Sequence, residues 1–142
     1  MQRAARYLIA ERGDSALAFR LDEISEVGRL PAVARTAASR RDGMLRLHGS
    51  MVPLVDAACL SRPTPAPEGQ PGWFVAMKRD PVSCVAVDAV VGIRTATEQR
   101  TRGSGTSVIE HEGRCASVVD ASLLVSSLSD RGDAGELPDR AS

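Results

Sequence analysis

Four aspartates are the residues of this sequence whose type and placement could carry chemistry. Each closes an apolar or alternating run, in RLD, LVD, AVD and VVD, and they are Asp22, Asp56, Asp88 and Asp120. A carboxylate at such a point could act as a general acid or base, accept a phosphoryl group, or accept hydrogen bonds from the backbone of a following helical turn. Because catalytic groups need not recur once per repeat, the fourfold occurrence favours a structural role as turn or cap.

A catalytic role would need partners that the sequence does not supply. No histidine, lysine or second carboxylate is reliably placed beside any of the four aspartates, and neither a G-x-S-x-G motif nor a phosphate-binding P-loop occurs. We therefore expect no catalytic residues and no enzyme. A small hydrolase or phosphoacceptor protein that uses one exposed aspartate stays open as the alternative.

Hairpins are the elements that must position these aspartates. Alternating runs separated by short turns predict four of them, at 7–11 with 16–21, 44–48 with 51–55, 73–77 with 82–87, and 108–111 with 114–119. The turns fall at 13–14, at Gly49 and Ser50, at 78–81 and at 112–113, and three of these four contain glycine. After Asp120, residues 121–128 read as the best helix of the chain.

A proline-rich segment divides the chain in two. Residues 61–72 hold four of the eight prolines and predict a linker or exposed loop. Each half then contains two hairpins, too few to bury a core alone, so we expect a mainly β protein built from two small barrels packed together. The first subdomain spans about 15–60 and the second about 73–120, with some strands and the C-terminal helix shared. Pro53 lies inside a predicted strand, which places it at an edge or a bulge.

Composition excludes several classes of partner. Basic and acidic residues balance at 18 each, and aromatic residues make up 3% of the 142 residues, so we expect no nucleic-acid binding. No apolar run of about 18 residues exists, which predicts no direct membrane insertion. The three cysteines form no CxxC pair, and no spacing suggests metal ligands, so we expect a cytoplasmic chain without metal or cofactor.

The quoted runs together resemble the CheW family of chemotaxis adaptors. The matching stretches are FRLDEISEVGRLP, GMLRLHGSMVPLVDAACL, VAVDAVVGI and GRCASVVDASLL, in the family's order and spacing, and they span roughly 7–128. The resemblance implies two SH3-like five-stranded barrels with short helices, within a CheW-like domain at 5–128 followed by a polar tail at 129–142. It also implies a non-catalytic scaffold of bacterial signal transduction through two-component chemosensory arrays.

The same resemblance implies partners and contact residues. CheW-like proteins bind the tip of a methyl-accepting chemoreceptor in a groove between the barrels, and they bind the regulatory domain of a CheA-type histidine kinase or other CheW-like proteins. The positions expected to contact partners are Glu26, Val27, Leu30, Arg46, His48 and Ser50. The positions expected to hold turns or caps are Asp22, Gly49, Pro53, Asp56, Asp88 and Asp120.

Some positions depart from the family's pattern. The family's turn usually reads Asn-Leu-Arg-Gly, whereas this chain has Arg46 and His48 in place of the Asn and the Arg, and Ala57 in place of a leucine. The stretch between Asp88 and Asp120 looks shorter than in the family, so we expect one barrel to lack a strand and to allow a homodimer or strand exchange. The departures predict a divergent accessory member in motility control, such as a gliding-motility (Frizzy-type) CheW-like protein.

Overall fold

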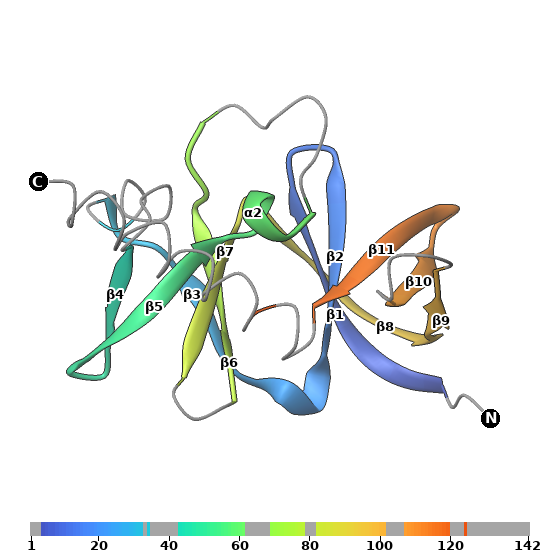
Figure 1. Ribbon diagram of the computed structural model, residues 1–142, viewed down its shortest axis with the longest axis horizontal. Helices are drawn as coiled ribbons and strands as arrows, with labels where there is room; N and C mark the ends of the chain where they lie inside the picture. The colour runs from blue at the N-terminus through green and yellow to red at the C-terminus, as the bar shows by residue number, and fades with distance from the viewer. Residues whose placement is uncertain are drawn as a thin grey trace, which may run out of the picture.

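The computed structural model describes residues 4–32, 34, 43–61, 69–78, 82–101, 107–119 and 124. Most of these residues lie in β-strands, and the strands form two curled sheets that pack against each other (Figure 1). The mainly β fold with two small barrel-like units, expected from the sequence, is confirmed.

The first unit, here called the end barrel, combines strands from the two ends of the chain. Its strand order is β8-β1-β2-β11-β10-β9. The strands are β1 (Ala4–Arg12), β2 (Ser15–Arg20), β8 (Ala89–Thr97), β9 (Gln99–Arg100), β10 (Ser107–His111) and β11 (Arg114–Val119).

One continuous run of chain closes the end barrel. The edge strands β8 and β9 are separated in sequence by Glu98 alone, yet β8 pairs with β1 and β9 pairs with β10. The expectation of a missing strand was therefore wrong, because β8 is nine residues long and bends at Glu98 onto the opposite edge. The expectation of a homodimer or strand exchange stays a prediction.

The second unit, the middle barrel, is formed by the central part of the chain. Its strand order is β3-β6-β7-β5-β4, and its strands are β3 (Ile24–Arg29), β4 (Met44–Leu47), β5 (Ser50–Asp56), β6 (Trp73–Met77) and β7 (Ser83–Val87). The 3-10 turn η1 (Leu21–Glu23) leads into β3, and the short helix α2 (Ala58–Ser61) follows β5. The chain therefore crosses between the barrels at η1 and again between β7 and β8.

The distribution of the strands between the two barrels differs from the division that we expected at the proline-rich segment. The two halves at 15–60 and 73–120 do not form separate sheets, because β5 pairs with β7 and β2 pairs with β11, each in parallel. The predicted hairpins themselves are present, but the second pairs with the third and the first pairs with the fourth. Parallel pairing of distant strands leaves no signal in a local pattern, so the linker position suggested the wrong partners.

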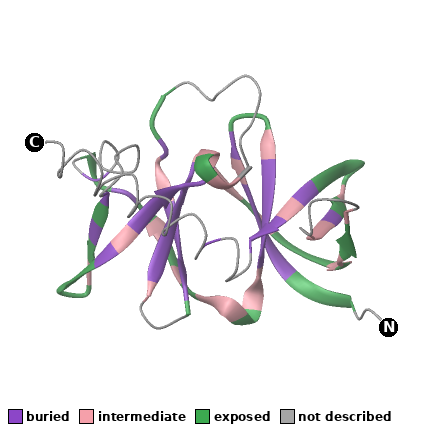
Figure 2. Ribbon diagram, in the orientation of Figure 1, coloured by how far each residue is buried: buried purple, intermediate pink, exposed green. Residues whose placement is uncertain are grey.

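Alternation along the strands builds three apolar cores. In β1, Tyr7 and Ile9 face the interior of the end barrel, whereas Leu8 and Ala10 face the middle barrel. The core between the barrels, here called the joint core, contains Leu8, Ala10, Leu17, Phe19, Val55, Ala57, Val75, Met77, Val85, Val87, Val119 and Leu124. Figure 2 shows buried residues concentrated where the strands of the two barrels meet.

The tight turns agree with the left-handed backbone that two-residue hairpins require. His48 and Gly49 both have positive φ, 50° and 82°, which is the type I′ geometry favoured by the twist of the flanking strands. The turn therefore lies one residue earlier than expected, and Ser50 is the first residue of β5. The ladder of hydrogen bonds between β5 and β7 runs from Leu54 to Asp56 and so begins after Pro53. The missing backbone N–H of Pro53 therefore removes no hydrogen bond from that ladder.

The expected C-terminal helix falls almost wholly outside the described residues. Leu124 alone of the range 121–128 is described, and it is helical and fully buried in the joint core. Asp120 also lies outside the described residues.

Candidate functional site

Asp56 lies at the end of β5, where the chain turns into α2. Its Oδ1 accepts a hydrogen bond of 2.9 Å from the backbone N–H of Ala58, so the carboxylate caps the turn that begins the helix. The side chain is buried, and Arg12 of β1 approaches it with two parallel hydrogen bonds. Arg12 Nε donates to Oδ1 at 2.8 Å and Nη2 donates to Oδ2 at 3.0 Å.

Asp88 occupies the crossing from β7 to β8 and contacts the same arginine. Arg12 Nη1 donates to Asp88 Oδ1 at 2.9 Å, while the backbone N–H of Gly13 donates to Oδ2 at 2.6 Å. Each of the four carboxylate oxygens therefore accepts at least one hydrogen bond, so both aspartates hold neighbouring elements in place. The hydrogen bond to Asp56 is the main cause of the raised pKa of Arg12, which stays charged in this buried cluster.

The turn or cap role expected for the four aspartates takes a different form at the other described positions. Asp88 is followed directly by β8 and not by a helical turn, so it binds the turn of a distant hairpin instead. Asp22 is exposed inside η1, and no side chain caps that turn. A similar sequence pattern therefore has three different structural settings, because each aspartate meets a different neighbouring element.

Sequence reasoning missed Arg12, although a signal for it exists. Period-2 alternation places Arg12 on the same face of β1 as Leu8 and Ala10, which is the face that becomes the joint core. A cation at 4% exposure on an apolar face needs anions beside it. The recurrent aspartates are the anions that the sequence offers for this pairing.

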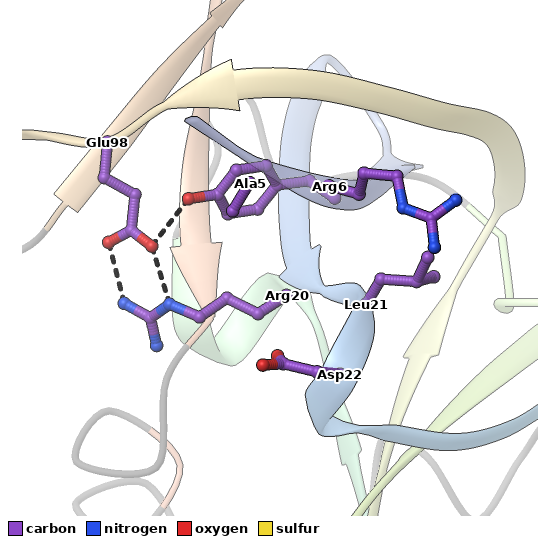
Figure 3. Close-up of a pocket in the computed structure, with 7 residues that line it drawn as sticks. Ala5, Arg6, Arg20, Leu21, Asp22 and Glu98 are labelled. Atoms are coloured by element: carbon purple, nitrogen blue, oxygen red, sulfur yellow. Dashed lines mark hydrogen bonds and ion pairs between the residues drawn. The ribbon is translucent and has the colours of Figure 1, made fainter. Parts of the chain in front are cut away.

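A second charged cluster lies at the opposite crossing, between β2 and β3. Arg20 Nε and Nη2 donate to the two carboxylate oxygens of Glu98 at 2.6 and 2.7 Å, and the Tyr7 hydroxyl donates to Glu98 at 2.7 Å. Figure 3 shows Arg20 of β2 facing Glu98, the residue between β8 and β9. The hydrogen bond with Arg20 is the main cause of the lowered pKa of Glu98, and burial is the main cause that raises the pKa of Tyr7 to about 12.

This second cluster borders a cavity of about 450 Å³. The lining residues are Ala5, Arg6, Tyr7, Arg20, Leu21, Asp22 and Glu98. Two of its charged groups, those of Arg20 and Glu98, are already paired with each other. Their hydrogen bonds join β2 to the bend between β8 and β9.

The expected contact residues do not form one patch. A hydrogen bond of 2.5 Å links a carboxylate oxygen of Glu26 to His48 Nε2. It joins β3 to the tip of the β4–β5 hairpin. Glu26 lies opposite Ala76 of the middle-barrel core, and its charge adds to the burial that raises the pKa of Cys84 to about 12. These two expected residues are therefore brought together at one edge of the middle barrel.

The other four expected contact residues lie in different surroundings. Leu30 is 1% exposed within the middle-barrel core, so it does not offer a surface to a partner. Arg46 lies opposite Met51 on the outer face of the hairpin, and Ser50 is exposed beside the turn. Val27 is 37% exposed and lies opposite Val75, a joint-core residue.

Val27 has a counterpart on the end barrel that sequence reasoning also missed. Ile93 of β8 is 49% exposed and lies opposite Leu8, another joint-core residue. Because directly opposed residues of antiparallel strands share a face, Val27 lies on the same face as Val75, and Ile93 lies on the same face as Leu8. Each is therefore an exposed apolar side chain beside a joint-core residue of its own barrel.

A model of one protein family matches most of the sequence. The CheW-like domain model matches residues 6–129. The chain belongs to the CheW-like domain family. The crystal structure of the scaffolding protein TtCheW from Thermoanaerobacter tengcongensis is similar, with a TM-score of 0.63 at 9% identity, covering 83% of this chain and 90% of that chain.

A comparison with curated protein sequences found no match. Membership of the CheW-like domain family supports a scaffold or adaptor role in chemotaxis, and the structural neighbour supports the fold. Within the described part of this CheW-like chain, no three histidine, cysteine, aspartate or glutamate side chains gather as a metal site. None of its described helices is long and apolar enough to cross a membrane.

Proposed function

We propose that this CheW-like chain is a non-catalytic adaptor of a bacterial chemosensory array and works in the cytoplasm. The observation that carries the proposal is the match of the CheW-like domain model to residues 6–129. Val27 of the middle barrel and Ile93 of the end barrel, each exposed beside a joint-core residue, are the apolar positions that we assign to the partner surface. A partner with an apolar stripe can bury both side chains at once, whereas solvent exposure of both is unfavourable.

The partner that fits this surface is the helical tip of a methyl-accepting chemoreceptor. A helix presents an apolar stripe that can lie along the line where two sheets meet. A CheA-type kinase regulatory domain, or another CheW-like protein, would use a separate surface. The outer face of the β4–β5 hairpin offers one, because Met44 and Met51 are 38% and 53% exposed beside Arg46.

The pairing of Glu26 with His48 supports a divergent role in motility control. The family's arginine at this place presents a planar fork with five N–H donors, whereas the imidazole of His48 has only two ring nitrogens with which to bind a partner. His48 is exposed at the hairpin tip, so its bond with Glu26 adds little to the stability of the fold. We infer that the chain modulates coupling or array assembly more than it activates the kinase.

Glutamate substitutions at these two apolar positions test the adaptor proposal. Val27→Glu and Ile93→Glu should each weaken binding of a chemoreceptor-tip fragment by about tenfold or more, because burying a carboxylate there is costly. Met51→Glu is the matched control, since it places the same charge on an equally exposed apolar position of the hairpin. Equal binding by the wild type, Val27→Glu and Ile93→Glu would contradict the proposed surface.

Reconstitution tests the divergent role separately. We expect the chain to bind a receptor tip and to stimulate the autophosphorylation of a CheA-type kinase weakly in reconstituted arrays. His48→Arg restores the family's residue, and stimulation should then increase. Full stimulation by the wild-type chain would contradict the divergent role while leaving the adaptor proposal standing.

A further inference from the structure

The Arg12 cluster, which comprises Arg12, Asp56 and Asp88, spans the two barrels. Arg12 belongs to β1 of the end barrel, Asp56 ends β5 of the middle barrel, and Asp88 connects β7 to β8. Arg12 Nη2 also donates to the backbone oxygen of Gly69 at 3.2 Å, which ties the segment before β6 to the same group. One guanidinium therefore touches both barrels and one of their two crossings.

The cluster differs in kind from the core beside it. Apolar contacts are non-directional, so side chains in the joint core can tolerate a small rotation of one sheet over the other. The guanidinium is planar and presents a rigid fork, and both carboxylates have all of their oxygens bonded. A rotation of the barrels would break several buried charged hydrogen bonds together.

The opposite crossing provides a weaker restraint. There Arg20 binds Glu23 of η1 at 3.3 Å, and both side chains are more exposed than Arg12. The bidentate bonds of Arg20 go to Glu98, which belongs to the same barrel, and they do not link the two units. Among the described residues, the buried charged side-chain contact between the barrels is therefore concentrated at Arg12.

We propose that the Arg12 cluster holds the two barrels at one fixed angle and thereby keeps Val27 and Ile93 in register as a single docking surface. The binding part rests on the proposed function. Arg12 is then a positioning residue, because it acts on the partner through the relative placement of the barrels. The replacement of its charge network should alter binding more than it alters folding.

The native cysteines allow a direct measurement of the angle. Cys59 in α2 and Cys115 in β11 are exposed and lie one in each barrel, whereas Cys84 is fully buried. Spin labels on Cys59 and Cys115 therefore report the distance between the barrels without any engineered site. Double electron–electron resonance would give the distribution of that distance.

The test variant is Arg12→Leu/Asp56→Asn/Asp88→Asn. It removes all three charges, while each asparagine oxygen can still accept the backbone N–H that its aspartate accepted. We expect this variant to fold, to show a distance distribution clearly broader than that of the wild type, and to bind the receptor-tip fragment about tenfold more weakly. Ile109→Ala is the stability control, because it creates a cavity in the end-barrel interior away from the cluster.

The outcomes separate the two proposals. An unchanged distance distribution in the folded triple variant would overturn the inference, as would the same broadening in Ile109→Ala. If the triple variant fails to fold, Asp56→Asn alone weakens the bidentate link between β1 and β5 while Arg12 stays paired to Asp88, and an unchanged distribution there overturns the inference. A wild-type chain that binds no receptor tip refutes the proposed function, and the distance measurement then decides the inference by itself.

Discussion

Arg12 and Asp56 face each other across the boundary between the two barrels, joined by two parallel hydrogen bonds of 2.8 and 3.0 Å. The arginine ends one strand and the aspartate ends another, 44 residues later in the sequence. With 4% and 6% of their surfaces exposed, the two charges depend on each other and not on water. Removal of the guanidinium alone would therefore leave buried carboxylates without their counter-charge.

The first prediction concerns the loss of that guanidinium alone. Arg12→Leu should lower the free energy of unfolding by about 3–5 kcal/mol, because it leaves buried carboxylates without their counter-charge. Urea denaturation followed by circular dichroism measures the loss. Arg114→Leu is the control, since Arg114 pairs with Glu11 at 3.3 Å in the open and should cost less than about 1 kcal/mol. Similar losses for both variants would contradict the view that burial makes the difference.

The second prediction concerns the contact between Gly28 and Phe74 in the middle barrel. A Cβ on Gly28 would lie 2.6 Å from the Phe74 ring, so Gly28→Ala should destabilise the fold by about 1–3 kcal/mol through overpacking. Gly72→Ala is the matched control, because its Cβ would have no heavy atom within 4 Å. Thermal melts of both variants, and of Gly28→Ala with Phe74→Leu, measure the effect. The second change should recover part of the loss.

The third prediction concerns the bend that closes the end barrel. Glu98 has a lowered pKa in the folded state, so its contribution to stability is present above the unfolded value of about 4.3 and is lost as pH falls further. Glu98→Gln should cost about 1–3 kcal/mol at pH 7. The difference from the wild type should shrink below about pH 4. Urea midpoints measured from pH 3 to 7 check this, and a difference independent of pH would refute it.

The fourth prediction concerns Cys84. Burial raises its pKa to about 12, so the thiol stabilises the fold fully below the unfolded value of about 8.5 and loses this contribution as pH rises towards 12. The free energy of unfolding of the wild type should therefore fall between about pH 8.5 and 10. That of Cys84→Ala should fall less steeply over the same range. Thiol titration of the native chain should find two reactive groups, Cys59 and Cys115. A third fast-reacting thiol would contradict the burial.

The local part of the fold could be predicted from the sequence. The turn Glu112-Gly113 was found from its glycine, and both residues have the positive φ of a two-residue hairpin, 50° and 76°. The sequence predicts Gly49 as the first residue of its turn, whereas Gly49 is the second, so the turn lies one residue earlier than predicted. The turn Glu112-Gly113 also identified β10 and β11, because an apolar or mixed run of strand length lies on each side of it.

The candidate site was predicted less well, and for a definite reason. Glu26 and His48 were both chosen and do meet, but Leu30 was chosen as a contact and lies in a core. Ile93 was missed because exposure along β8 depends on which strand covers it. An apolar residue in a strand looks the same in sequence whether a neighbouring sheet buries it or stops short of it.

What the sequence determined by itself was the set of hairpins and the membership of the CheW-like family, because turn chemistry and period-2 alternation act between residues close in the chain. Only the tertiary structure decided that the first hairpin joins the fourth and that β5 lies beside β7. It also decided that Arg12 reaches Asp56 and Asp88. Such contacts depend on which apolar faces bury one another, and that choice is made by the chain as a whole.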